Sequence, residues 1–209
     1  MHKLQRGNAP DCLSNYQHGK DNWGNLGPDD RTAIWRELDA MQGQRCAYCE
    51  SDIADGNKHI EHFCQKGRDP TATFLWSNLF GSCNREESCG KHKDRRISYL
   101  PTDLLKPDED NPEHYLVFAA DGSVSPRKNL SPVDQRRATE TLRIFNLNRV
   151  LRHIRFREIA GYVQTAEEIA ELAKHYPESE WLPLLQDELA KISHLPFATA
   201  IKHVLTRQA

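Results

Sequence analysis

Apolar residues along the first half of the chain predict one helix and two short strands. Residues 1–28 carry no periodic pattern and are interpreted as an irregular arm. From Asp29 to Gly43 the apolar side chains recur at helical spacing, and a glycine commonly ends a helix. Further along, Lys58–Phe63 is predicted to be a strand, and Leu75–Gly81 a second strand or a turn.

The centre of the chain contains turn signals rather than long periodic stretches. Residues 101–112 hold three prolines and several acidic residues, so a linker or an exposed loop is expected there. The segment Tyr115–Val124 contains the dipeptide Asp121-Gly122, which suits a tight type I′ turn. A β-hairpin is therefore predicted for this segment.

The last part of the chain is predicted to be helical. Ser131 followed by Pro132 is a typical helix start, and an apolar stripe continues to about Tyr162. The segment Thr165–Glu168 has the pattern of a capping box, which predicts a new helix that ends at Pro177. Two shorter helices are expected at 180–193 and 197–207.

Charge is distributed unevenly along the chain, although the net charge is only −2. Arg127–Arg157 contains nine Lys or Arg and two acidic residues, whereas Glu158–Glu188 contains eight acidic residues and one Lys. The basic segment predicts a positively charged surface. Two interpretations of it remain open: a helix that follows nucleic-acid phosphates, or a helix face that is merely solvated or docks an acidic partner.

Hydropathy gives no sign of a membrane segment. No apolar run reaches the length of about 18 residues that a membrane span needs, and residues 1–6 lack an apolar signal core. A cytoplasmic protein without a membrane partner is therefore expected. Thiols stay reduced in that compartment, which favours metal binding over disulfide bonds. The chain also lacks a P-loop motif, so ATP hydrolysis of that kind is not expected.

Four cysteines arranged in two pairs predict a structural metal site. They are Cys46, Cys49, Cys83 and Cys89. Two such pairs can close one tetrahedral zinc site, which would supply folding energy to a polar segment. Cys12 and Cys64 lie outside the pairs and are expected to be ordinary buried thiols rather than ligands.

Glu61 and His62 lie between the two cysteine pairs, where a nuclease site is predicted. Hydrolysis of a phosphodiester needs a base for water and positive charge to offset the developing negative oxygens. His62 can be the base, because histidine titrates near neutrality. Glu61 can bind magnesium or manganese, hard cations that prefer oxygen ligands. A further ligand is expected from Asn84, Lys91 or His92, of which His92 is the best donor.

Two nearby polar residues are each compatible with more than one role. Asn78 is predicted to pin the hairpin and orient His62, and a turn-capping role would place it similarly. His59 shares the strand face of Glu61, because side chains two positions apart in a strand point the same way. His59 is equally compatible with supporting the site and with an ordinary surface position.

Taken together, these motifs resemble the HNH (ββα-metal) endonucleases. More specifically, they resemble the HNH subunit of Septu anti-phage systems, also found beside retrons, the PtuB family. It covers nearly the whole chain. The segments that carry it are Lys3–Arg6, Cys12-Leu13, Cys46–Ser51, Ile60–Phe63, Asn78–Cys83, Cys89–Asp94 and Leu147-Asn148.

The resemblance implies an α+β fold, in which a zinc-stabilised ββα-metal nuclease core is flanked by mainly α-helical regions. The regions expected are an N-terminal arm and helix at 1–45, the zinc-bound core at 46–100, a linker and β-hairpin at 101–130, and a C-terminal helical region at 131–209.

The resemblance also implies a toxic effector nuclease that acts on DNA or RNA with a larger ATPase subunit of the ABC/SMC type. In a retron setting, a reverse transcriptase with its RNA–DNA product would hold the complex in check. Carried over by position, Glu61 takes the metal-ligand place, His62 that of the general base, and Asn78 that of the middle asparagine. The four paired cysteines take the places of the structural zinc ligands.

Two positions depart from the family pattern. Gln65 stands where many HNH sequences have a proline, and Gly90 stands where the last His or Asn often follows the final Cys. His92 is near enough in sequence to substitute for the latter. Two other functions stay open, a zinc-ribbon module that binds nucleic acid without chemistry and an adaptor that docks on an ATPase. A working base at His62 distinguishes the nuclease from both.

Overall fold

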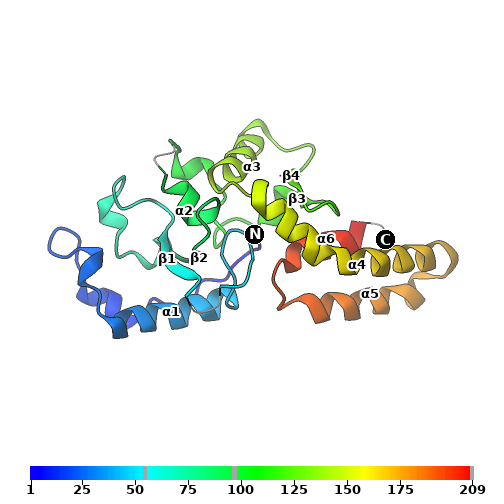
Figure 1. Cartoon of the computed structure of the whole chain (residues 1–209), viewed down its shortest axis with the longest axis horizontal. Coiled ribbons are helices and arrows are strands. Elements are labelled where there is room, and N and C mark those ends of the chain that lie inside the picture. The colour runs from blue at the N-terminus through cyan, green and yellow to red at the C-terminus, as the bar shows by residue number, and fades with distance from the viewer. Residues whose placement is uncertain (54–55, 96–97, 208–209) are drawn as a thin grey trace.

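The computed structural model describes residues 1–53, 56–95 and 98–207 and mixes helices with two small sheets. Figure 1 shows α1, α2 and the first sheet toward one end, and α4 and α5 side by side toward the other. The helices are α1 (Pro28–Gln42), α2 (Cys89–Lys93), α3 (Pro132–Ile144), α4 (Arg149–His175), α5 (Glu178–Ile192) and α6 (Ala198–Arg207). The strands are β1 (Lys58–His62), β2 (Leu79–Cys83), β3 (Leu116–Phe118) and β4 (Val124–Pro126). The predicted mixture of helices and strands is confirmed.

Helix α1 begins and ends where its residues dictate. Pro28 occupies the first turn, where its missing N–H leaves no donor unpaired. Gly43 ends the helix at φ 60°, a left-handed conformation that costs glycine little. Ile34 and Leu38 are fully buried on one face, so the helix packs against the rest of this end of the molecule.

The first sheet is an antiparallel pair of β1 and β2. Glu61 is opposite Phe80 and His62 is opposite Leu79, at the end of the pair. Strand β1 was predicted correctly. The second strand begins later than expected, because Trp76–Asn78 forms a turn of 3₁₀-helix and β2 starts only at Leu79. All five residues of β2 are buried, whereas in β1 only Glu61 and His62 are, so the sheet is enclosed at the end that carries these two residues.

The helix boundaries predicted between 131 and 177 are wrong in two places. The chain leaves the helical path between Ile144 and Arg149, where Asn146 has φ 48°. The side chain of Asn148 holds this break, because it bonds the backbone N and O of Val124, each at 2.9 Å. In contrast, α4 continues through the apparent capping box at Thr165 without interruption. Local helix signals there are overridden by the burial of Ile159, Ala166 and Ile169 along one face.

The segment that carries the cysteines packs directly on the break between α3 and α4. The rings of Tyr48 and Phe145 stack with their centroids 4.0 Å apart, and both are fully buried. The Cys89 N–H donates to the Phe145 carbonyl at 2.8 Å. The buried Glu50 carboxylate accepts the Thr199 N–H at 3.0 Å, which joins the same segment to α6. The predicted hairpin is confirmed as β3 and β4, with Gly122 at φ 78° in its turn.

Within the part of the chain that is described, none of the helices combines the length and the apolar character that crossing a membrane would require.

Candidate active site and metal centre

The four paired cysteines converge in the interior of the protein. Their sulfur atoms all lie within 4.8 Å of one another, and all four residues are buried. Tetrahedral zinc with Zn–S bonds of about 2.3 Å separates its sulfur ligands by about 3.8 Å, which this cluster fits. The backbone supports the arrangement: Glu50 at φ 66° turns the first pair, and Cys89 has φ 55°. The predicted ligands therefore form a candidate metal centre, and all six cysteines of the chain are free thiols.

Cys12 and Cys64 lie outside this cluster, as expected. Both are half-buried rather than fully buried. Burial raises the pKa of each thiol, so both are held in the unreactive protonated form.

His62 is buried at the end of β1 with one ring nitrogen engaged. Its Nε2 lies 3.0 Å from the Thr73 carbonyl, which can only accept a hydrogen bond, so Nε2 carries the hydrogen. The Trp23 ring packs against the imidazole in a T-shaped arrangement, with the ring centroids 4.4 Å apart. Burial, followed by the nearby Lys66 ammonium, lowers the pKa of His62 from its ordinary 6.5 to about 4. The imidazole is thus neutral near pH 7, and Nδ1 keeps the lone pair that a base needs.

Glu61 is buried beside His62 and is held by two cationic or polar neighbours. Its Oε1 lies 2.7 Å from Lys93 Nζ, and its Oε2 lies 3.1 Å from His59 Nε2. Lys93 is itself fully buried and also donates to the His62 carbonyl at 3.0 Å. Burial alone would lower the pKa of Lys93, but the Glu61 and Asp94 carboxylates raise it above its ordinary value. Lys93 is therefore a charged anchor that ties α2 to the end of β1.

His59 and Asn84 complete this group on the side of Glu61 Oε2. His59 Nδ1 lies 3.0 Å from Asn84 Oδ1, and the His59 side chain is 24% exposed. Asn84 Nδ2 donates to the carbonyls of Gly56 and Lys58, which fixes the orientation of the amide. His59 was compatible either with supporting the site or with an ordinary surface position. These contacts agree with the supporting role.

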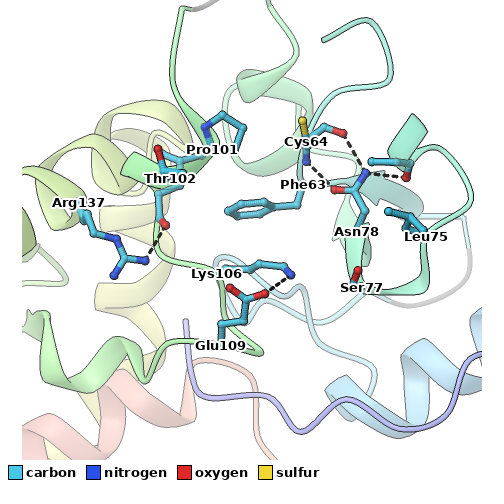
Figure 2. A pocket seen from close by; sticks show the side chains of 12 residues that line it. Phe63, Cys64, Leu75, Ser77, Asn78, Pro101, Thr102, Lys106, Glu109 and Arg137 are labelled. Carbon is cyan, nitrogen blue, oxygen red and sulfur yellow. Dashed lines mark hydrogen bonds and ion pairs between the residues drawn. The ribbon is translucent and has the colours of Figure 1, made fainter. Parts of the chain in front are cut away.

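Asn78 pins the chain that follows His62. Its Oδ1 accepts the Cys64 N–H at 2.7 Å, and its Nδ2 donates to the carbonyls of Cys64 and Ala72 at 3.0 and 3.1 Å (Figure 2). These bonds join the segment after β1 to the segment before β2. The predicted influence of Asn78 on the orientation of His62 would pass through this backbone.

His92 lies on α2 and is held by a different part of the protein. Its Nδ1 lies 2.9 Å from the Ile144 carbonyl at the end of α3. Among residues 1–53, 56–95 and 98–207, the cysteines form the single converging group of three or more His, Cys, Asp or Glu ligand atoms. The structure thus does not gather Glu61, His62 and His92 into such a group. Lys91 is on the surface, 3.6 Å from Glu86.

Gly90 departs from the expected motif for a steric reason. A Cβ at this position would lie 2.3 Å from Glu61 Oε2 and 2.9 Å from His59 Nε2. Both distances are below van der Waals contact, so a side chain at 90 is incompatible with the observed positions of Glu61 and His59.

The arginines of the basic segment are largely committed to the fold. Arg155 is 1% exposed, and its side chain donates to the carbonyls of Gly122 and Leu147. Four of the segment's other seven arginines form ion pairs, Arg136–Asp103, Arg137–Asp110, Arg143–Glu140 and Arg152–Asp121, each at 2.6 Å. These contacts weigh against a free phosphate-binding helix face.

Sequence reasoning missed the role of Lys93 and left that of His59 open. Lys93 was noticed only as part of the Cys89–Asp94 segment, because nothing in a sequence distinguishes a buried lysine from a surface one. For His59, its place two residues before Glu61 was the available signal.

Comparisons with known proteins connect this site to HNH-type proteins of defence systems. No protein-family model matches the chain. It is 26% identical over 189 residues to the "Septu protein PtuB" of Bacillus thuringiensis, which covers 84% of this chain and 66% of that protein. It is also 26% identical over 119 residues to the "Retron Vc95 putative HNH endonuclease" of Vibrio cholerae serotype O1 biovar El Tor, which covers 54% of this chain and 56% of that protein.

These similarities confirm the resemblance to Septu- and retron-associated HNH proteins that the motifs predicted. The chain spans less than two thirds of the length of either relative, at 66% and 56%.

Proposed function

We propose that this chain is a metal-dependent HNH endonuclease and the toxic effector subunit of a Septu- or retron-type defence system. The observation that carries the proposal is the buried pair at the end of β1. His62 is neutral with Nδ1 available, and the Glu61 carboxylate is next to it in the sequence. A binding module or an adaptor needs neither a desolvated base nor a buried carboxylate beside it.

Each residue of the site has a defined task in this proposal. His62 Nδ1 takes the proton of the attacking water, while Thr73 holds the ring through Nε2. Glu61 would hold magnesium or manganese, and the bound ion would supply positive charge for the phosphate oxygens and the leaving oxygen. The sequence also points to His92 as a second ligand, but in the structure its Nδ1 bonds the Ile144 carbonyl. Asn78 fixes the chain after His62 through Cys64.

The cysteine cluster would bind a structural zinc ion. This zinc would take no part in the reaction. Its thiols are fully enclosed, which suits a closed four-ligand site. In this proposal residues 46–100 form the ββα-metal core, with β1, β2 and α2 as its elements. Residues 1–45, 101–130 and 131–209 flank it as arm and helix, linker and hairpin, and helical region.

A cleft beside His62 offers a path for nucleic acid. It is lined by residues 18–24, Lys66, Pro70 and Thr73, the residue whose carbonyl holds His62. Lys66 Nζ lies 5.5 Å from the centre of the Trp23 ring, so the cleft combines basic and aromatic groups. Such a combination suits phosphates and stacked bases. DNA is the favoured substrate, and RNA such as a tRNA is the alternative.

A partner protein would have to supply most of the contacts that bind the nucleic acid. The net charge is −2, and of the eight arginines of the basic segment four form ion pairs within the chain and Arg155 donates hydrogen bonds to carbonyls. We propose that an ABC/SMC-type ATPase subunit presents the nucleic acid, and that a retron reverse transcriptase with its RNA–DNA product restrains the complex where one is encoded. Co-purification with the product of the neighbouring ATPase gene tests the association.

The proposed activity is tested by expressing the chain with and without its neighbouring genes and sequencing the broken nucleic acid. Strand breaks that depend on this chain and on added magnesium or manganese are expected. Intact nucleic acid, together with binding of DNA by the isolated chain, would identify a zinc-ribbon binding module instead. Intact nucleic acid with ATPase association alone would identify an adaptor.

A further inference from the structure

His59 and Glu61 present two ligand atoms to one point on the face of β1. They are two positions apart in the strand, so their side chains leave the same face. His59 Nε2 and Glu61 Oε2 are 3.1 Å apart. The Glu61 side chain is 2% exposed and that of His59 24%, so the point between them is reached from the side of the imidazole.

The hydrogen-bond network makes both of these atoms acceptors. The Asn84 amide is oriented by the Gly56 and Lys58 carbonyls, which receive its Nδ2 hydrogens. Its Oδ1 therefore faces His59 Nδ1 at 3.0 Å, and that nitrogen must carry the hydrogen. In the neutral ring, Nε2 then points a lone pair at a carboxylate oxygen. Two lone pairs at 3.1 Å require a cation or an additional proton between them.

The separation of the two atoms matches a small divalent cation. Magnesium binds its ligands at 2.0–2.1 Å in octahedral geometry, so neighbouring ligands are about 3.0 Å apart. A carbonyl oxygen behind a ligating imidazole, as Asn84 provides, is the usual way to fix the tautomer and the ring orientation. The Glu61 oxygen that faces away from His59 is already engaged by Lys93 at 2.7 Å, which leaves Oε2 for the cation.

The surroundings agree with a site that has two protein ligands. In the described segments, no third His, Cys, Asp or Glu donor converges on this point. Magnesium commonly takes water and substrate phosphates in its remaining positions. The absence of a side chain at Gly90 keeps the point accessible, because a Cβ there would meet Glu61 Oε2 at 2.3 Å. The nearby Lys93 charge predicts weak cation binding until a phosphate arrives.

We propose that His59 Nε2 and Glu61 Oε2 together bind the divalent cation, with Asn84 fixing the imidazole. This inference rests on the proposed nuclease function and deepens it, since it assigns the second ligand to β1 instead of to His92 on α2. The ligand that other HNH sequences place after the final Cys is thus contributed here from the strand.

Manganese binding to the zinc-loaded full chain tests the assignment without any cleavage assay. The free Mn²⁺ signal in electron paramagnetic resonance gives the affinity of wild type, His59→Gln, Asn84→Leu and His92→Ala. We expect His59→Gln to weaken binding at least about tenfold and Asn84→Leu to weaken it by about tenfold. His92→Ala should keep the wild-type affinity. Zinc content and circular dichroism check the fold of each variant, and His59→Ala replaces any variant that fails this check.

Three outcomes would overturn the assignment. Unchanged Mn²⁺ affinity in folded His59 variants would show that the imidazole is not a ligand. Loss of binding in His92→Ala instead would return the second ligand to α2. The third outcome is a wild-type protein that binds no Mn²⁺ at millimolar concentration, with or without a nucleic-acid fragment. That result would show that a shared proton, and not a cation, lies between His59 Nε2 and Glu61 Oε2.

The assignment and the proposed function fail in distinguishable ways. Mn²⁺ binding that depends on His59, in a protein whose complex leaves DNA and RNA intact, supports the site and overturns the nuclease. Cleavage that depends on His62, in a protein whose Mn²⁺ affinity ignores His59, supports the nuclease and overturns the site.

Discussion

The Lys93 ammonium lies 2.7 Å from Glu61 Oε1, and both side chains are shielded from solvent. Lys93 comes from α2 and Glu61 from β1, so this ion pair joins the helix to the strand that carries His62. Lys93 also donates to the His62 carbonyl at 3.0 Å and to Asp94 Oδ1 at 2.7 Å. With its hydrogens used in this way, the buried charge is compensated.

Replacing Lys93 should therefore destabilise the protein strongly. Lys93→Met would leave the Glu61 carboxylate buried without its counter-charge, which costs about 3–5 kcal/mol of folding free energy. Urea unfolding followed by tryptophan fluorescence measures the change. Lys91→Met is the matched control, because Lys91 lies on the same helix but is exposed and should change the stability by less than about 0.5 kcal/mol. Equal effects of the two substitutions would show that the buried Lys93–Glu61 ion pair does not contribute to stability more than a surface lysine does.

The cysteine cluster should carry one zinc ion per chain and much of the stability of the core. Structural zinc contributes on the order of 10 kcal/mol of folding free energy, so Cys83→Ser should lose the metal and unfold the segment around it. Elemental analysis and circular dichroism follow the two effects. Cys12→Ser, which changes a thiol outside the cluster, should keep the zinc and the fold. Soluble, folded wild-type protein without zinc would refute this prediction.

His62 should make the stability depend on pH in a defined direction. Burial and Lys66 lower its pKa to about 4 in the folded protein, against 6.5 ordinarily. Between these values the unfolded chain binds a proton that the folded chain does not, so stability falls as the pH falls. From about pH 7.5 to about pH 5.5 this one group should remove about 1 kcal/mol from the free energy of unfolding.

A variant isolates this contribution from that of the other titrating groups. His62→Asn has no proton to bind, so its free energy of unfolding should fall by about 1 kcal/mol less than that of wild type over the same range. Zinc is kept saturating so that metal loss does not contribute. Parallel pH profiles of the two proteins would show that His62 is not buried in a neutral form.

The parts of the fold that follow from local chemistry were predictable from the sequence. Pro28 and Gly43 mark the ends of α1, and Asp121-Gly122 marks the β3–β4 turn. The break between α3 and α4 was not, because it involves the Asn148 side chain just before α4, which bonds Val124 from the distant β4 strand. The continuity of α4 through Thr165 likewise depends on burial of its apolar face.

The same distinction between local and long-range features applies to the candidate site. The spacing of the cysteines and the adjacency of Glu61 and His62 are visible in the sequence, and the structure gathers the four cysteines. The partners of Glu61 are not visible, because they depend on which side chains the fold buries around it. His59 and Lys93 contact its two oxygens, whereas His92 contacts Ile144.

The central claim is that His62 Nδ1 is the base of a nuclease, and the cleavage rate of His62→Ala tests it most directly. The rate is measured on the substrate identified by sequencing, in the complex with the neighbouring subunit. We expect a loss of at least about 100-fold, with unchanged zinc content and partner association. The exposed His175 on α4 supplies a matched His→Ala control that should cut at the wild-type rate. A His62→Ala protein that cuts at nearly the wild-type rate would contradict the account.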